Sequence, residues 1–403
     1  MIKKQIGTII LSFLLILAVA GCSSDENNKT ESNTSTAQTS DPSIPKLSTN
    51  EVHPPHLIRL YDTSQFSIIW NELIDTYYIA CGMFFGFESD FLFNSDMRVD
   101  YQQTIEHFTP YRNHSFVQGL GRYLDIQNKY ADMEVLYYLS QYIISVSNTG
   151  LGIGNIQSNI FQSDDEFYSF IVALYEFYQE TDANVFFGSS NIHNDKRQYL
   201  LEYAKDVPID DLINEMENYV GNKSVMYGSN NIYYYSMVSV YKSPNNASFR
   251  IFGMNNDIFM TSIQSPLGFD GDFSIAQLFE TAQHEALHMY INSGIEVHSQ
   301  LIQDLSKDKN PLDFTSGFYV YMPWHRIVDE AVVRVVQARI YGIVYDDLTF
   351  AYQQILSKED QFGFQNIDGI CHILEEYELN RAKYPTIDDY STVLIERYLS
   401  NSP

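Results

Sequence analysis

The chain has 403 residues, with 24 lysine and arginine residues against 51 aspartate and glutamate residues, which gives a formal net charge of −27 at pH 7. Such a charge repels nucleic acid and anionic lipid headgroups, so we expect neither as a partner. Only 3 cysteines are present, which excludes a disulfide scaffold. The length suits one large domain with two lobes, or two domains.

The first 21 residues have the features of an export signal. Lys3 and Lys4 form a charged start, residues 9–20 form an apolar run too short for a comfortable membrane span, and Ala20-Gly21 precede Cys22. This stretch resembles the lipobox of bacterial lipoproteins. The resemblance implies a signal peptide over residues 1–21, lipidation of Cys22, and a protein tethered to the cell membrane and facing outside the cytoplasm. A plain secretory signal and an uncleaved anchor are the alternatives.

Residues 22–52 follow the lipidated cysteine and are dominated by serine, threonine, asparagine and aspartate, with no aromatic residue. Such a segment cannot bury enough apolar surface to offset the entropy of ordering, so we expect a disordered linker. The remaining chain divides at a change in hydrophobic period near residue 230. We therefore expect a helical N-terminal lobe over residues 53–230 and a catalytic lobe over residues 231–403.

The N-terminal lobe shows apolar residues at three- and four-residue spacing, which is typical of helices. Helices are predicted over residues 67–83, 132–147, 165–180, 195–205 and 210–220, and Gly221 ends the last of them. Aromatic residues are abundant, with 31 tyrosines and 26 phenylalanines in the whole chain, and we expect them to pack helix on helix. Cys81 and Cys371 either form a disulfide or remain buried thiols.

Between residues 232 and 263 the hydrophobic period changes from helical to two, which is typical of strands. Strands are predicted over residues 232–241, 248–253 and 257–263, joined by Asn-rich turns into a meander. A strand edge beside a metal ion is suited to hold an extended peptide by backbone pairing.

A single helix is predicted over residues 274–294, with Ser274 as its N-cap and Gly294 as its C′ residue. It contains His284-Glu285-x-x-His288. The histidines are four residues apart, so both imidazoles project from one face and can share a zinc ion. Glu285 lies one position round the helix, where it can contact a metal-bound water. The alternative is a surface helix with two unrelated histidines.

A catalytic zinc ion usually has three protein ligands, and Glu330 is the strongest candidate for the third. On the predicted helix over residues 324–342, Arg326, Glu330, Arg334 and Gln337 form a narrow polar strip, whereas Asp329 falls among apolar residues. An ordinary half-solvated helix with a Glu330–Arg334 pair is the alternative. The metzincin pattern is excluded, because Ile291 and Gly294 stand where that pattern needs glycine and histidine.

A glutamate on a second helix after H-E-x-x-H resembles the gluzincin metallopeptidases. The similarity is closer to a family of uncharacterised bacterial H-E-x-x-H proteins, often exported, with an E-x-x-x-R helix downstream. It also covers residues 107–114, 177–181 and 376–385. The thermolysin-like N-E-x-x-x-D pattern is absent, because Asp329 precedes the glutamate and Arg334 occupies the fourth place after it.

The hydrophobic patterns predict an α+β fold, predominantly helical, with a small antiparallel sheet next to the H-E-x-x-H helix, and the resemblance implies that this helix is of the zincin type. It implies that His284, His288 and Glu330 bind Zn²⁺, that Glu285 is the catalytic carboxylate, and that Arg334 supports catalysis. We therefore expect a zinc metallopeptidase that hydrolyses a peptide or protein substrate, with Glu285 as general base. A zinc hydrolase of a non-peptide amide or ester and a non-catalytic binding lipoprotein are the alternatives. Candidate donors to the oxyanion are Arg334, His325, Tyr319 and Tyr321.

Overall fold

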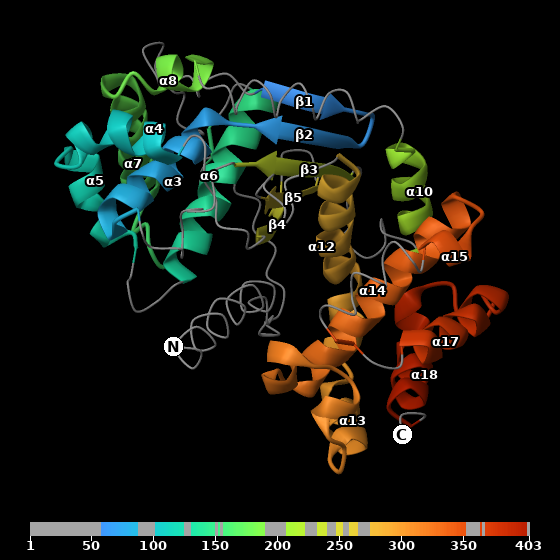
Figure 1. Ribbon diagram of the computed structural model, residues 1–403. Helices are drawn as coiled ribbons and strands as arrows, with labels where there is room; N and C mark the ends of the chain where they lie inside the picture. The colour runs from blue at the N-terminus through green and yellow to red at the C-terminus, as the bar shows by residue number, and fades with distance from the viewer. Residues whose placement is uncertain are drawn as a thin grey trace, which may run out of the picture.

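The computed structural model describes residues 58–87, 101–124, 130–149, 152–153, 156–189, 207–221, 232–239, 247–252, 258–264, 275–351, 363–364 and 367–400. The export signal, the linker and the helix predicted over residues 195–205 lie outside these residues. The described chain is predominantly helical with one small sheet, as predicted (Figure 1).

The sheet contains five strands in the order β1-β2-β3-β5-β4. Their bounds are β1 Ile58–Asp62, β2 Phe66–Trp70, β3 Ile232–Val238, β4 Ala247–Phe252 and β5 Ile258–Gln264. Strands β2, β3 and β5 are parallel to one another, and the outer strands β1 and β4 each pair antiparallel with their neighbours. The sheet is therefore mixed, and the prediction of an antiparallel sheet is wrong.

The predicted meander fails because β3 pairs with β5 and β2 rather than with β4, the next strand in the chain. Strand β3 is buried along almost its whole length, as central parallel strands are, since both of their faces are covered. Strands β1 and β2 come from the N-terminal part of the chain. The sheet thus draws on both sides of the boundary predicted near residue 230, and the division into two lobes stays a prediction.

The helices of the N-terminal half gather at the left end of the sheet in Figure 1. They are α3 Glu72–Phe85, α4 Tyr101–Phe108, α5 Ser115–Gly119, α6 Tyr130–Thr149, α7 Asp164–Glu180 and α8 Ala183–Ser189, with the short 3-10 turns η1 Thr109–Tyr111 and η2 Leu120–Arg122. Helices α6 and α7 agree with the predicted ranges. The helix predicted from residue 67 begins later, because Phe66–Trp70 form β2 and the Asn71 side chain caps α3 by accepting from the Leu73 amide.

Aromatic side chains hold the N-terminal helices together, as expected from the composition. Phe161 and Phe170 both contact Tyr123, and Phe116 stacks on Phe177. These contacts join the elements around α5 and α7 into one core, so the aromatic residues there are accounted for by packing.

The C-terminal half surrounds one buried helix, α14. The helices are α10 Ile209–Val220, α12 Ile275–Glu296, α13 Ser299–Ser306, α14 Trp324–Val344, α15 Leu348–Ala351, α17 Ile367–Leu379 and α18 Ile387–Ser400, with 3-10 turns η5 Pro311–Asp313 and η6 Gly317–Tyr321. Helix α14 contacts α10, α12, α13, α15 and α17, and every residue from Arg326 to Gly342 is buried. Helix α12 packs between α14 and strands β3, β4 and β5.

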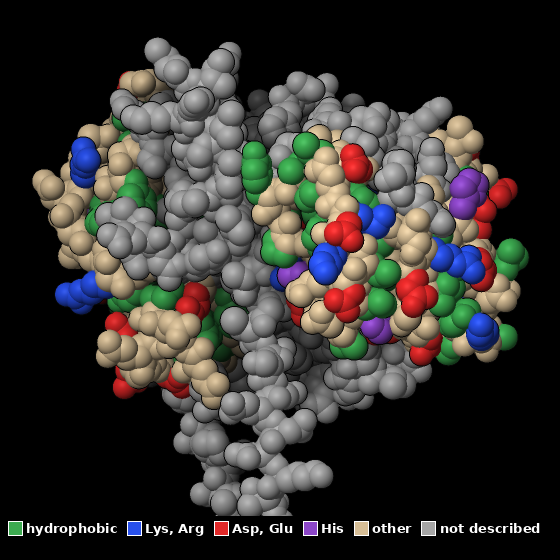
Figure 2. Space-filling view, turned by 90° about the horizontal axis from the view of Figure 1, so that it is seen from below, with side chains coloured by type: hydrophobic (Ala, Val, Ile, Leu, Met, Phe, Trp, Pro, Cys, Tyr) green, Lys and Arg blue, Asp and Glu red, His purple; other side chains and the backbone are tan. Residues whose placement is uncertain are grey.

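The surface of the C-terminal helices mixes charges of both signs on the face that Figure 2 shows. Cys81 and Cys371 are buried thiols in the described structure. Within the described ranges, we find no helix with the length and apolar character needed to cross a membrane.

Candidate metal centre

Two helices bring the predicted metal ligands together. His284 and His288 lie on one face of α12, and Glu330 lies on α14, which packs against that face. Helix α12 continues to Glu296 instead of ending at Gly294 as predicted. Gly294 lies inside the helix, where a Cβ atom would clash with Asp388 Oδ1. The glycine therefore permits close packing against the start of α18.

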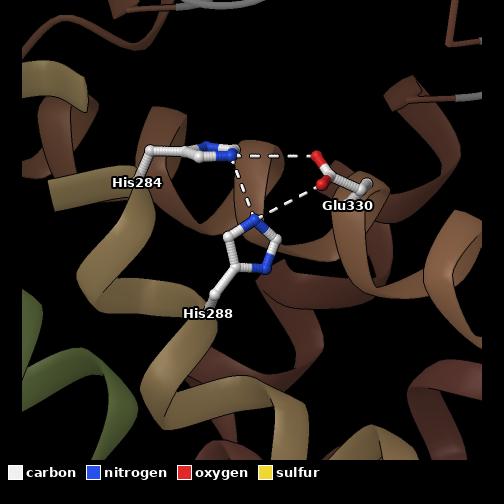
Figure 3. Close-up of side chains that lie close together, drawn as sticks. All are labelled: His284, His288 and Glu330. Carbon is white, nitrogen blue, oxygen red and sulfur yellow. Dashed lines mark hydrogen bonds and ion pairs between the residues drawn. The ribbon is translucent and has the colours of Figure 1, made fainter. Parts of the chain in front are cut away.

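The three candidate ligands point toward one another (Figure 3). The Nε2 atoms of His284 and His288 are 3.1 Å apart, and Glu330 oxygens lie 3.7 Å from the first and 3.5 Å from the second. A tetrahedral ion with bonds of about 2.0–2.1 Å separates its ligand atoms by about 3.3–3.4 Å. The donor set and its spacing therefore fit a zinc ion with little movement. These three residues would fill three of the four tetrahedral positions.

Arg334 holds the Glu330 carboxylate in place. Its NH2 group donates to Glu330 Oε2 at 2.9 Å and to the Tyr319 hydroxyl at 3.1 Å. The guanidinium also lies over the Tyr319 and Phe364 rings. Arg334 and Glu330 are both buried, so the pair is largely shielded from water. In this arrangement Arg334 orients the candidate third ligand, whereas its predicted catalytic role stays a prediction.

Asp329 makes a contact that the sequence did not predict. Its Oδ2 atom lies 3.1 Å from His288 Nδ1, on the ring edge opposite Glu330. In the amide orientation that satisfies both of its ends, Asn292 donates to both Asp329 oxygens, at 2.6 and 2.8 Å, and to the His288 carbonyl at 2.9 Å. Arg326 lies 3.9 Å from the same carboxylate.

Gln337 lies beside His284, with which its side chain forms a hydrogen bond. The Gln337 amide nitrogen donates to the Glu280 carbonyl at 2.6 Å and to Gln283 Oε1 at 3.3 Å. These two bonds fix the orientation of the amide. The polar strip predicted on α14 is thus buried against α12, and its residues contact the histidines or their neighbours.

The two histidines differ in their electrostatic surroundings. Burial, the Arg334 charge and the His288 charge lower the pKa of His284 well below its usual range, so this ring is neutral at pH 7. Burial also disfavours the charged form of His288, but Asp329 and then Glu330 outweigh it and raise the pKa to about 9. Without a metal, the pair therefore carries about one positive charge on His288 at pH 7.

Glu285 is half-buried on α12, and its charge contributes to the raised pKa of His288, which places it near the site. Among the other predicted donors, Tyr319 is buried and contacts Arg334, whereas Tyr321 is 73% exposed. His325 is half-buried, and burial followed by the Arg326 charge lowers its pKa. Of the four, Arg334 bonds directly to the candidate ligand Glu330, and Tyr319 is linked to Glu330 through Arg334.

The other segments that carried the resemblance have structural roles. His107 bonds to the Thr181 carbonyl at 2.7 Å, and His114 caps α5 through the Phe116 amide, so the first segment packs on the end of α7. Arg381 donates to the Asn218 and Tyr219 carbonyls at the C-terminal end of α10. Cationic groups at a helix C-terminus satisfy carbonyls that lack a partner within the helix.

Comparison with known families places most of the chain in one of them. Residues 85–396 match the family described as a domain of unknown function, DUF4932. The chain belongs to this family. The match covers α12, α14 and the whole candidate metal centre, and it begins after strands β1 and β2. Neither a protein of curated function nor a solved structure matches the chain.

Proposed function

We propose that the protein is a zinc-dependent peptidase that acts outside the cytoplasm. The observation that carries the proposal is the spacing of the three donors, 3.1, 3.5 and 3.7 Å, which is close to that of a tetrahedral zinc site. Two imidazoles and one carboxylate are a ligand set found at catalytic zinc ions, which keep a position open for water. When bound, zinc supplies an activated water and polarises a carbonyl group.

Glu285 supports a hydrolytic role for this site over a structural one. Glu285 follows His284 directly on α12 and its charge acts on His288, while Glu330 rather than Glu285 completes the candidate ligand set. A carboxylate that binds no metal beside such a site is suited to take a proton from the attacking water and to deliver it to the leaving amine. A purely structural metal site needs no such group.

The sheet edge supports a peptide substrate. Strand β4 is one of the two outer strands of the described sheet and is antiparallel to β5, and α12 contacts both β4 and β5. An outer strand next to the helix that carries the site is positioned to pair with an extended peptide backbone. An amide or ester without a peptide backbone would gain nothing from such an edge.

The experiment that tests this function combines metal analysis with peptide cleavage. We expect about one zinc ion per chain in the parent protein and in Glu285→Gln, and its loss in His284→Ala. A peptide library analysed by mass spectrometry should show cleavage by the parent protein, and by Glu285→Gln at a rate about 10²- to 10⁴-fold lower. Full activity of Glu285→Gln would refute the general-base role. Zinc without cleavage of any peptide would refute the peptidase, and a parallel screen of amides and esters would then identify the other hydrolase.

The membrane tether is part of the same proposal and depends on the sequence around Cys22. We expect the parent protein in the membrane fraction and labelled by a radioactive fatty acid, and Cys22→Ser without the label. A labelled Cys22→Ser variant would refute lipidation at this residue.

A further inference from the structure

His288 is held at both ring nitrogens by adjacent residues of α14. Glu330 Oε1 lies 3.5 Å from Nε2, and Asp329 Oδ2 lies 3.1 Å from Nδ1. Because the two nitrogens are on opposite edges of the imidazole, the ring is enclosed between two consecutive carboxylates. Only one of them belongs to the proposed ligand set.

Asp329 is itself fixed by groups on both helices. The Asn292 amide donates to both of its oxygens and, one turn from His288 on α12, also to the His288 carbonyl. Arg326 contributes a positive charge 3.9 Å away and also pairs with Glu296 at 3.6 Å. With 2% of its surface exposed, Asp329 cannot exchange these partners for water.

We propose that Asp329 is a positioning residue for the metal centre, which holds His288 in the tautomer that presents the Nε2 lone pair to a metal. An ionised carboxylate only accepts hydrogen bonds, so its partner Nδ1 must carry the proton. Nε2 then faces His284 and Glu330 without a hydrogen when the ring is neutral. The metal-binding part of this inference rests on the proposed function, whereas the tautomer does not require a metal.

The two ligand histidines are positioned by different chemistry. His284 bonds to the neutral side chain of Gln337, whose nitrogen is engaged by the Glu280 carbonyl. An amide can turn over and offer either a donor or an acceptor, whereas a carboxylate offers acceptors alone. The tautomer of His288 is therefore set by the identity of one residue, and that of His284 by the orientation of another.

The first measurement is the zinc affinity of the full chain, by competition with a coloured chelator, for the parent, Asp329→Ala, Asp329→Asn and Asp304→Asn. Residues that orient metal-binding histidines contribute about 10- to 100-fold in affinity, and we expect that loss for Asp329→Ala. Asp329→Asn should recover part of the loss, because its amide oxygen still accepts from Nδ1–H. Asp304 is an exposed α13 carboxylate bonded to Gln300, so Asp304→Asn should leave the affinity unchanged.

The second measurement is the NMR spectrum of the histidine ring nitrogens in the metal-free protein, recorded across an alkaline pH series until the rings are neutral. The parent should show His288 protonated on Nδ1, and Asp329→Ala should show a shift toward the Nε2–H form. Unfolding curves identify variants that fail to fold. If Asp329→Ala fails to fold, the zinc affinity of Asp329→Asn and the ring spectrum of the parent test the positioning role of Asp329.

Three results distinguish this inference from the proposed function. A folded Asp329→Ala that binds zinc within about twofold of the parent overturns the positioning role while the zinc site stands. An Nε2–H tautomer for His288 in the parent overturns it whether or not zinc binds. A parent protein that takes up no zinc refutes the proposed function, and the ring spectrum alone then supports or overturns the assignment of the tautomer.

Discussion

Replacement of Arg334 by methionine should destabilise the metal-free protein far more than an exposed arginine would. The Arg334 guanidinium is buried and donates to Glu330 at 2.9 Å. Methionine replaces the apolar methylene chain of the arginine but not its charge. Removal of the charge leaves Glu330 buried beside Asp329 with its strongest partner gone. The expected effect is therefore mainly electrostatic.

The magnitude follows from the geometry of the pair. Unit charges about 4 Å apart attract by about 4 kcal/mol at an effective dielectric constant of about 20. Removing one partner of a buried pair typically costs about 3–5 kcal/mol, because the other charge remains desolvated. His288, which is protonated near Glu330 in the absence of metal, compensates part of this. We expect Arg334→Met to lower the free energy of unfolding by about 3 kcal/mol.

The assay is a double-mutant cycle by chemical denaturation of metal-free protein, with Arg334→Met, Glu330→Gln and the combination. The contact of Arg334 with Tyr319 is lost in both backgrounds, so the cycle isolates the charge pair. We expect Arg334→Met to cost about 3 kcal/mol in the parent background and about 1 kcal/mol in the Glu330→Gln background. Equal losses in the two backgrounds would refute the view that Arg334 acts on the Glu330 carboxylate.

Two further predictions concern the packing around α18. Gly221 has a φ of +101°, and a Cβ atom there would lie 2.8 Å from the Thr386 Cα. Gly221→Ala should therefore lower the melting temperature and reduce the free energy of unfolding by about 2–4 kcal/mol. Gly119→Ala is the control, because open space surrounds Gly119, and it should be neutral or stabilising. Burial and the neighbouring Asp389 raise the pKa of Asp388 to about 6, so folding favours the protonated acid, and its contribution to stability is lost as pH rises through about 6. Asp388→Asn should therefore stabilise the protein by about 1–2 kcal/mol at pH 8, after allowance for solvent screening, and give no gain at pH 4. Equal effects at both pH values in melting curves would contradict the raised pKa of Asp388.

The proximity of the three candidate ligands was predictable because it depends on the local geometry of two helices. Two histidines four residues apart must share a face of α12, and the polar strip on α14 contains the single glutamate that completes the set. The strands were harder to predict, because pairing joins residues that are distant in the chain. Residues 67–70 were included in a predicted helix, although Phe66–Trp70 form β2 and lie next to β3.

Asp329 was missed for a different reason. A helical wheel separates a polar face from an apolar one, and Asp329 falls among the apolar residues of α14. The wheel is informative when one face of a helix meets water, but α14 is buried on all sides from Arg326 to Gly342. Its residues contact α10, α12 and α17, so the sequence of α14 alone does not tell which neighbour each side chain meets.

The polar residues of α14 explain how the site can exist before a metal binds. Asp329 and Glu330 carry two negative charges, and Arg326, Arg334 and protonated His288 lie within 4 Å of them. A buried carboxylate pair without such partners would be unfavourable. A zinc ion needs the Nε2 lone pair of His288, so its binding must displace the proton that helps to balance this charge. The charge of the metal would then balance the Asp329 and Glu330 carboxylates in place of the positive charge lost from His288.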